Sequence, residues 1–410
     1  MEVGRNSDRL VETLAVARQD SLRGKAAIVG VADAASPTGE LDGTTRALEV
    51  RMIREALDDA GLTISDVDAV FSNVSAGWAP SLELAEYLGI SPRWTDSTNT
   101  GGSSFEIHVE HAAAAIALGL CDVAVIAFAA NPRSSFKQGK GGWGSRQTGG
   151  ASPMAEWEMP YGARMPMGAY ALAASRHQHE FGTTAEQLAQ IAVDTRRWAA
   201  LNPRARLREP ITVDDVLTSP MEATPLHKLD CCLVTDGAGA IVMTSAERAG
   251  TLRRPPVLIL GTGTCHTHAM ISQMPDLTVT GAAVSGALAF AAAGIAPADV
   301  DVVQLYDSFT ITVLLLLEDL GFCPKGEGGP FVAGGVLAPG GALPANTTGG
   351  GLCYTHPGQF GIFLLVEAAR QLRGECGERQ VADAEVAVAH GSGGVLSAMS
   401  TIVLGSEVTA

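Results

Sequence analysis

The sequence predicts an α/β protein built from two halves that repeat one supersecondary pattern. Segments with the apolar spacing of helices alternate with short apolar runs that are typical of buried strands. The second observation is an internal repeat, because residues 56–70 and 291–303 both predict a helix end, a glycine stop, a capped turn and a strand. Glycine is abundant, at 47 residues, and aromatic residues make up 5%, a composition suited to close packing of helices on sheets.

The first half is expected to span residues 25–250, after an N-terminal extension at 1–24 that predicts an extra helix or arm. Its strands are expected at 25–31, 66–71, 123–129, 229–235 and 239–244, and its helices at 48–60, 82–88, 105–118, 168–181 and 184–200. The stretch 131–166 is rich in glycine, serine and proline. A loop of this length inside a compact domain is usually functional, so we expect a lid or a dimer loop.

The second half is expected to span residues 251–410, beginning after the linker that starts at Arg253. Its strands are predicted at 257–261, 300–305, 386–389 and 401–404, and its helices at 281–293, 310–320 and 358–372. A long loop rich in glycine and proline, residues 323–357, precedes the last helix.

Charge and composition exclude several functions. The net charge of −16 argues against binding to nucleic acid or to an anionic membrane, since both require a basic surface. The apolar run at 112–130 is interrupted by Cys121 and Asp122, and the polar N-terminus contains no signal peptide core, so we expect a cytoplasmic protein without a membrane segment. The seven cysteines form no CxxC pair, so we expect no zinc site, and their odd number and scattered positions indicate reduced thiols. No bound cofactor is expected.

Four motifs in a fixed order resemble the thiolase superfamily, and they span nearly the whole chain. They are Asn99-Thr-Gly-Gly-Ser-Ser-Phe105 with its alanine-rich helix, Tyr306-Asp-Ser-Phe309, Gly349-Gly-Gly-Leu-Cys-Tyr-Thr-His-Pro-Gly358 and Ala389-His-Gly-Ser-Gly-Gly394. Within the superfamily, the sequence is most similar to sterol-carrier-protein-type thiolases and to the lipid-transfer-protein aldolases of steroid side-chain degradation.

The resemblance implies a thiolase fold of two duplicated βαβαβαββ halves in a five-layer αβαβα arrangement. It also implies a homodimer and an acyl-CoA substrate. The aldolases work with a small OB-fold protein that often carries a zinc ribbon, so the resemblance implies such an accessory partner, and any zinc is expected in the partner.

The sequence departs from a thiolase at the nucleophile. A thiolase places a reactive cysteine at the N-terminus of the helix in the first motif, where the helix dipole lowers the pKa of the thiol. Here that position falls at Gly102 or Ser103. Ser103 or Ser104 would replace the cysteine if His356 served as its base. The alternative is that one of these serines caps the helix.

The residues that stand at the remaining motif positions are proton-transfer groups. Tyr306 replaces a histidine of this thiolase type, His390 takes the place of a second cysteine, and His356 retains its motif position. The resemblance implies that Tyr306 and Tyr354 are the catalytic pair, without assigning which is base and which is acid. His356 and the backbone N–H groups near Gly102 and Ser103 would then bind the enolate oxygen.

These residues predict a carbon–carbon lyase. Retro-aldol cleavage of a β-hydroxyacyl-CoA with a bulky, steroid tail needs only proton transfer and enolate stabilisation, and it yields a ketone and a short acyl-CoA such as propionyl-CoA. Asp307 is expected to orient its loop rather than to take part in the chemistry. Two alternatives stay open: a thiolase-like acyltransferase and a non-catalytic CoA- or lipid-binding homologue.

Other patterns have weaker functional interpretations. The glycines of Gly391-Ser-Gly-Gly394, including Gly393, are expected to let the backbone approach the substrate, because no GK(S/T) follows as in a P-loop. His108 and His111 have metal-like spacing without a third ligand, which favours a structural role. The basic residues Arg133, Lys137, Lys140 and Arg146 would contact CoA phosphates or the partner, or form a solvated loop.

Overall fold

The computed structural model describes residues 22–73, 77–139 and 153–409. The predicted extension at 1–24 therefore lies almost entirely outside the described residues, as do residues 140–152 of the predicted loop at 131–166. The described residues form a nine-stranded mixed sheet in the order β3-β2-β4-β7-β1-β8-β11-β10-β9 and a separate two-stranded hairpin. The nine strands are β1 (Ala26–Ala34), β2 (Ala69–Ser72), β3 (Trp94–Asp96), β4 (Val123–Ala130), β7 (Gly237–Ser245), β8 (Val257–His266), β9 (Val302–Leu305), β10 (Val386–Gly393) and β11 (Ala398–Gly405).

Each half of the chain contributes one block of this sheet. Strands β3, β2, β4, β7 and β1 come from the first half, and β8, β11, β10 and β9 come from the second. The blocks meet where β1 and β8 pair antiparallel at Ala27–Leu258 and Ile28–Val257. In both blocks, the final strand of the half runs antiparallel to the first, because β7 pairs with β1 and β11 with β8. This arrangement confirms the duplicated α/β fold that the sequence predicts.

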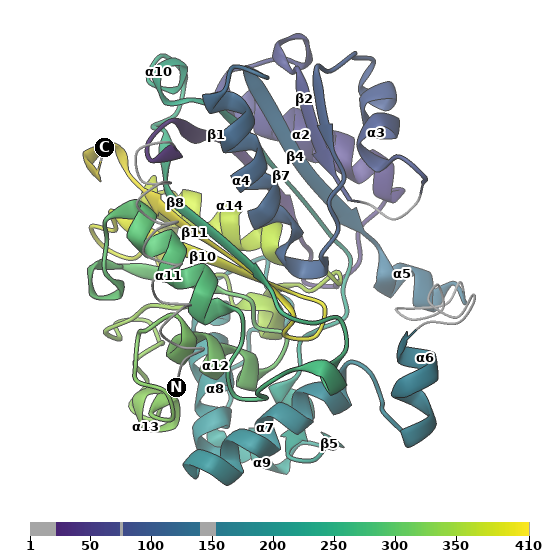
Figure 1. Ribbon diagram of the computed structural model, residues 1–410, viewed down its shortest axis with the longest axis vertical. Coiled ribbons are helices and arrows are strands. Elements are labelled where there is room, and N and C mark those ends of the chain that lie inside the picture. The colour runs from purple at the N-terminus through teal and green to yellow at the C-terminus, as the bar shows by residue number, and fades with distance from the viewer. Residues whose placement is uncertain (1–21, 74–76, 140–152, 410) are drawn as a thin grey trace.

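Helices lie on both sides of the strands and between the two blocks. Helices α2 (Thr45–Ala60) and α3 (Pro80–Leu88) cover strands of the first half, and α11 (Ala282–Ala293) covers β8 and β11. Between the blocks lie α4 (Ser104–Ala117) and α14 (Gly361–Leu372), which contact strands of both halves. Figure 1 shows α4 and α14 in this central position. The central layer therefore packs the helix of the first motif against the helix that follows the third motif.

Small residues allow the covering helices to lie directly on the strands. A Cβ atom on Gly30 of β1 would be 2.0 Å from the carbonyl oxygen of Ala56 in α2. In the second half, a Cβ atom on Gly261 of β8 would be 2.1 Å from the carbonyl oxygen of Ala289 in α11. The two halves thus repeat one packing device, in which a glycine in the first strand admits the backbone of the first covering helix.

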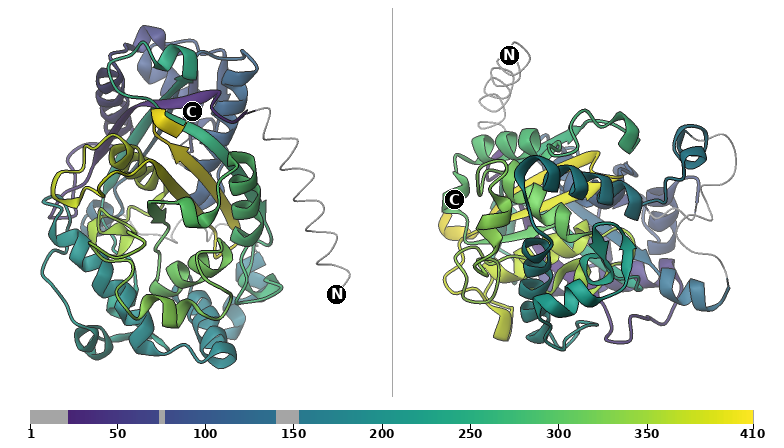
Figure 2. Two further views of the ribbon diagram at one scale, coloured as in Figure 1. Left: turned by 90° about the vertical axis from the view of Figure 1, so that its left-hand side faces the viewer. Right: turned by 90° about the horizontal axis from the view of Figure 1, so that it is seen from below.

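A long insertion separates β4 from β7. It contains α5 (Pro132–Lys137), α6 (Pro153–Trp157), α7 (Met167–Phe181), α8 (Ala185–Ala200), α9 (Val213–Thr218) and the hairpin of β5 (Met221–Ala223) and β6 (Leu226–His227). Figure 2 shows the teal helices of this insertion gathered at the end of the molecule away from β2 and α3. The second half adds α12 (Thr310–Asp319) and α13 (Gly328–Val332), and α10 (Ala246–Ala249) joins the halves.

One sequence-based expectation for a strand is wrong. Residues 229–235 do not form the predicted strand, because they contain the end of a 3-10 turn, Lys228–Asp230, followed by irregular backbone. The second half also lacks a full counterpart of β3, because only a single parallel bridge joins Val303 and Ala345 among the described residues. Pro344 has no N–H to extend that ladder, and Asn346 adopts a φ of 52°, which ends the extended backbone.

Candidate active site

Tyr306 occupies the position beside the start of α4. It follows β9, and its backbone N–H donates to the carbonyl oxygen of His390 on β10 at 3.0 Å. Its ring lies against the backbone of Gly102, where a Cβ atom would be only 2.1 Å from Cε2 of the phenol and 2.4 Å from the carbonyl oxygen of Ser392. The phenol therefore fills the volume into which any side chain at position 102 would project.

The hydroxyl of Tyr306 meets His356. Its oxygen lies 3.0 Å from Nε2 of His356, and the two rings meet edge to face with centroids 5.7 Å apart. Phe360 stacks on the histidine and also contacts the tyrosine ring edge to face. The sequence places Tyr306 and His356 in separate motifs 50 residues apart, and the structure joins them into one hydrogen-bonded pair.

Burial sets the charge of both members of this pair. Burial lowers the pKa of His356 to about 4, so its imidazole is neutral at pH 7 and Nε2 can accept a proton. Burial also raises the pKa of Tyr306 well above its ordinary value, so the phenol holds its proton in the resting protein. A neutral imidazole that faces a protonated phenol is arranged for proton transfer through the tyrosine to the histidine.

The loop that carries His356 is held by buried polar contacts. The backbone N–H groups of Gly351 and Leu352 donate to the carboxylate of Asp307, at 2.6 and 3.2 Å. The expectation is that Asp307 orients its own loop, whereas the structure shows its carboxyl group holding the loop that carries His356. The backbone N–H of His356 donates to the hydroxyl of Thr235 at 2.8 Å. Asp307 and Thr235, which lie outside this loop, therefore fix the position of His356 beside Tyr306.

Tyr354 faces a different set of groups. Its hydroxyl donates to the carboxylate of Asp33, which also forms ion pairs with Arg204 and Arg370. Its ring centroid lies 6.3 Å from that of Phe363, which in turn stacks on Phe360 beside the Tyr306–His356 pair. The structure therefore does not bring the hydroxyls of Tyr354 and Tyr306 into contact, although the resemblance implies that the two residues form a catalytic pair.

The Asp33 cluster is expected to make a large contribution to stability. Burial raises the pKa of Asp33, but Arg370, Arg204 and the Tyr354 hydroxyl lower it more, and the net pKa lies well below its usual range. Asp33→Asn leaves two arginines without their counter-charge. Because their side chains are 34% and 19% exposed, we expect a loss near the low end for buried pairs, about 3 kcal/mol of unfolding free energy.

Urea denaturation checks this expectation. The matched control is Asp122→Asn, since Asp122 also pairs with an arginine but its side chain is 70% exposed. The control is expected to cost less than about 1 kcal/mol. Equal losses in the two variants would contradict a structural role for the Asp33 cluster.

The predicted serines close the turn before α4. The hydroxyl of Ser104 accepts from the N–H of Thr100 at 2.9 Å and donates to the carbonyl of Gly101 at 2.7 Å. Ser103 is the N-cap residue by position, but its hydroxyl makes no capping bond and lies 3.0 Å from the hydroxyl of Thr100. Within the described part of the chain, neither serine hydrogen-bonds to a histidine or a carboxylate, so neither has the base that a serine nucleophile needs.

Gly393 permits the close approach of this turn to β10. A Cβ atom at Gly393 would lie 1.8 Å from the carbonyl oxygen of Thr100 and 2.6 Å from the hydroxyl of Ser103. The predicted residues Gly102, Ser103 and Gly393 are therefore brought together beside Tyr306.

His390 points away from this turn. In β10, successive side chains point to opposite faces, and Gly391 and Gly393 face α4. The Nδ1 atom of His390 lies 2.8 Å from the hydroxyl of Thr401, which lies 2.9 Å from that of Ser285 on α11. Burial lowers the pKa of His390 to about 3. The structure thus separates its imidazole from the face that carries Tyr306.

Sequence reasoning missed Glu106. It lies in the first turn of α4 and is fully buried, and neither carboxyl oxygen has a hydrogen-bond partner among the described residues. Its carboxyl group lies against the Cα atoms of Gly391 and Gly361. The signal in the sequence was an acidic side chain flanked by the apolar residues Phe105 and Ile107 at the start of the alanine-rich helix.

The remaining predicted clusters have local partners. His108 approaches the carbonyl of Thr98 at 3.0 Å, and His111 pairs with Asp96. No group of three potential metal ligands occurs within 22–73, 77–139 and 153–409. Of the predicted basic cluster, Arg133 and Lys137 both pair with Glu40, whereas Lys140 and Arg146 lie outside the described residues.

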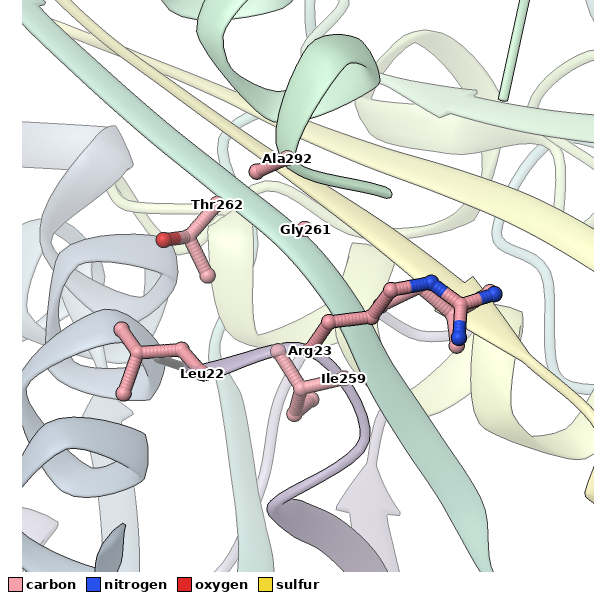
Figure 3. Close-up of a pocket in the computed structure, with 7 residues that line it drawn as sticks. Leu22, Arg23, Ile259, Gly261, Thr262 and Ala292 are labelled. Atoms are coloured by element: carbon pink, nitrogen blue, oxygen red, sulfur yellow. The ribbon is translucent and has the colours of Figure 1, made fainter. Parts of the chain in front are cut away.

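The pocket drawn in Figure 3 is separate from the Tyr306 site. It lies between Leu22, Arg23, residues of β8 and Ala292 of α11, and it shares no lining residue with that site. Its volume of about 10 Å³ admits one water molecule at most. Among the helices that the structure describes, none has the length and apolar character needed to cross a membrane.

Comparisons with known proteins identify the family. Residues 263–406 match the family model described as thiolase C-terminal domain-like. A steroid side-chain-cleaving aldolase of Thermomonospora curvata is 36% identical over 86% of this chain and 91% of its own. The chain belongs to the thiolase superfamily.

Other members of the thiolase superfamily extend this comparison. The 17-hydroxy-3-oxo-4-pregnene-20-carboxyl-CoA lyase of Mycobacterium tuberculosis is 36% identical over 86% of this chain and 92% of the lyase. An acetyl-CoA acetyltransferase of Methanothermobacter thermautotrophicus is 33% identical, with coverage of 90% and 96%. The solved structure of an Ltp2-ChsH2(DUF35) aldolase matches with a TM-score of 0.84 and 33% identity, covering 94% of this chain and 99% of the aldolase chain. This superfamily thus includes relatives with lyase and acyltransferase names at similar identity.

Proposed function

We propose that this protein is a carbon–carbon lyase. The proposed reaction is retro-aldol cleavage of a β-hydroxyacyl-CoA with a bulky, steroid tail, which releases a ketone and a short acyl-CoA such as propionyl-CoA. The observation that carries the proposal is the phenol of Tyr306 packed on Gly102, in the volume that a nucleophile at that position would need. The names of the aldolase and lyase relatives support the same reaction class.

The Tyr306–His356 pair carries the proposed proton transfer. Tyr306 takes the proton of the substrate β-hydroxyl as its own proton passes to Nε2 of His356, 3.0 Å away. The alkoxide then forms the ketone carbonyl as the Cα–Cβ bond breaks, and the bonding electrons become the thioester enolate. The pair returns one proton to the enolate carbon, so the reaction requires no further reactant.

The start of α4 is proposed to stabilise the enolate. The backbone N–H groups of Gly102 and Ser103 stand at the N-terminus of a 14-residue helix, where the helix dipole favours negative charge. For Tyr354, the hydrogen bond to Asp33 supports a role in holding the loop before His356. His390 is proposed to support β10 through Thr401.

A thiolase-like acyltransferase is the second candidate function. The acetyltransferase relative and the retained His356-Pro357 of the third motif favour it. A thiolase needs free CoA as the acyl acceptor, whereas the proposed lyase does not, so the two functions differ in a measurable requirement.

The solved Ltp2-ChsH2(DUF35) aldolase supports a proposal about partners. Its name includes a DUF35 protein, and we infer that this chain, as a homodimer, binds a small accessory protein of OB-fold type. Co-purification with such a protein, together with the mass of the complex by light scattering, checks this assembly.

One assay distinguishes the functions. The protein, with and without a DUF35-type partner, is given a steroid β-hydroxyacyl-CoA with a tertiary β-hydroxyl in one reaction and a steroid β-ketoacyl-CoA with free CoA in another. Ketone release without free CoA is the expected result. Cleavage of the ketoacyl substrate that depends on CoA would establish the acyltransferase instead. Binding of both esters without turnover in the presence of the partner would establish a non-catalytic subunit.

A further inference from the structure

Glu106 is buried at a position where it has no structural partner. The side chain is fully buried, and neither carboxyl oxygen meets a hydrogen-bond donor among the described residues. A buried polar group without a partner costs free energy, and a buried carboxylate costs more than a neutral acid. Native structures retain few such groups, so this one requires an explanation other than fold stability.

Two glycines create the space for the carboxyl group. A Cβ atom at Gly391 of β10 would lie 2.2 Å from Oε2 of Glu106, and one at Gly361, the first residue of α14, would lie 2.4 Å from the same oxygen. That Cβ at Gly361 would also be 2.4 Å from the carbonyl oxygen of Gly102. The carboxyl group thus adjoins the backbone of Gly102, against which the phenol of Tyr306 also lies.

The carboxyl group influences Tyr306 electrostatically. A negative charge on Glu106 adds to the causes that raise the pKa of Tyr306, after burial and the neighbouring Cys232 and Tyr170. A neutral Glu106 removes this repulsion. Because burial raises the pKa of Glu106 to about 8, against an opposing effect of its own backbone N–H, the group is mainly neutral at pH 7 and ionises in mild alkali.

The other titratable groups on the packed elements do not compensate this charge. His390 of β10 turns to the opposite face, and burial keeps both His390 and His108 neutral, since it lowers their pKa values to about 3 and about 4. Glu110, one turn further along α4, accepts from Thr264. On α14, Glu367 pairs with Arg379 and Arg370 pairs with Asp33. This leaves Tyr306, beside Gly102, as the group whose pKa rises with a negative charge on Glu106.

We propose that Glu106 is a positioning residue that, as a neutral acid, permits negative charge to develop on the Tyr306 oxygen and, once ionised, opposes it. Ionisation of Glu106 would thereby lower the activity of the Tyr306–His356 pair at alkaline pH. The kinetic part of this inference rests on the proposed lyase function, whereas the coupling between the two residues does not.

An infrared titration of the whole protein with its partner tests the coupling without turnover. The C=O band of neutral Glu106 is identified from its absence in Glu106→Gln, and the phenol C–O band of Tyr306 from its absence in Tyr306→Phe. We expect the Glu106 band to be present at pH 7 and to disappear in mild alkali, and the Tyr306 band to shift at the same midpoint. In Glu106→Gln, the Tyr306 band is expected to stay constant across that range. An ionised Glu106 at pH 7, or a Tyr306 band that does not respond, would overturn the proposal whether or not the protein is a lyase.

The pH dependence of kcat/KM is the second readout. Wild-type activity is expected to fall at least tenfold above the midpoint of the Glu106 band, whereas Glu106→Gln retains its rate there and stays within about threefold of wild type at pH 6. Glu110→Gln, on the same helix face, is the matched control. Its kcat/KM is expected to fall at alkaline pH as in wild type. If kcat/KM of Glu106→Gln still falls at alkaline pH as in wild type, or is lowered equally at every pH, the proposed effect of Glu106 ionisation on Tyr306 is overturned.

Discussion

Tyr306→Phe is expected to lower the rate of ketone release by at least about 100-fold, the usual scale for loss of a proton-transfer group. Phenylalanine keeps the ring on Gly102 and its edge contacts with His356 and Phe360, so the fold is expected to be retained, and loss of the buried hydrogen bond is expected to cost about 1–3 kcal/mol of unfolding free energy. Only the hydroxyl that lies 3.0 Å from Nε2 of His356 is removed. Initial rates on a β-hydroxyacyl-CoA and thermal denaturation measure the two quantities.

Tyr354→Phe provides the matched comparison, since it removes one hydroxyl from an equally buried tyrosine of the same motif set. The lost hydrogen bond to Asp33 is expected to cost about 1–3 kcal/mol of unfolding free energy, with a much smaller effect on turnover well below the melting temperature. If Tyr354→Phe instead loses turnover as severely as Tyr306→Phe at unchanged stability, Tyr354 acts in the reaction and its contact with Asp33 must open during turnover.

Substitution of Gly102 is expected to disable the site rather than restore a thiolase. In Gly102→Ala, the new methyl group would be 2.1 Å from Cε2 of Tyr306 and 2.4 Å from a backbone oxygen that cannot move independently of β10. We expect a loss of about 1–3 kcal/mol of unfolding free energy from overpacking. Turnover is expected to fall at least about tenfold, because the phenol must leave its contact with His356.

Gly102→Cys tests the chemistry directly. It supplies a thiol at one of the two positions, 102 and 103, where the thiolase nucleophile is expected, but no acyl-enzyme is expected in intact-mass spectra during incubation with acyl-CoA. Gly334→Ala is the control, since a Cβ atom there meets nothing within 4 Å. Acylation of the Gly102→Cys variant, together with thiolysis of a ketoacyl-CoA by free CoA, would show that the pocket is still a thiolase pocket.

The sequence by itself determined the layered fold. Alternation of helical and strand periodicity, the repeat at 56–70 and 291–303, and the small residues in β1 and β8 are local patterns, so they are visible before folding. The expectation for residues 229–235 was wrong because a short apolar run is equally consistent with irregular buried backbone, and only its tertiary neighbours distinguish the two. The motif order also placed Gly102, Ser103, Tyr306 and His356 in one superfamily site, and the structure brings these residues together.

Only the tertiary structure decided how the side chains of that site are paired. Tyr306 and Tyr354 have the same type of side chain in neighbouring motifs, but the packing directs one hydroxyl to a neutral imidazole and the other to a buried carboxylate. His390 and Gly391 are adjacent in sequence, but strand alternation places them on opposite faces of β10. The space for the Glu106 carboxyl group is created by Gly361 and Gly391, which lie 255 and 285 residues away in the chain. A residue's chemistry depends on its dielectric surroundings and its partners, and both are created by contacts between distant segments.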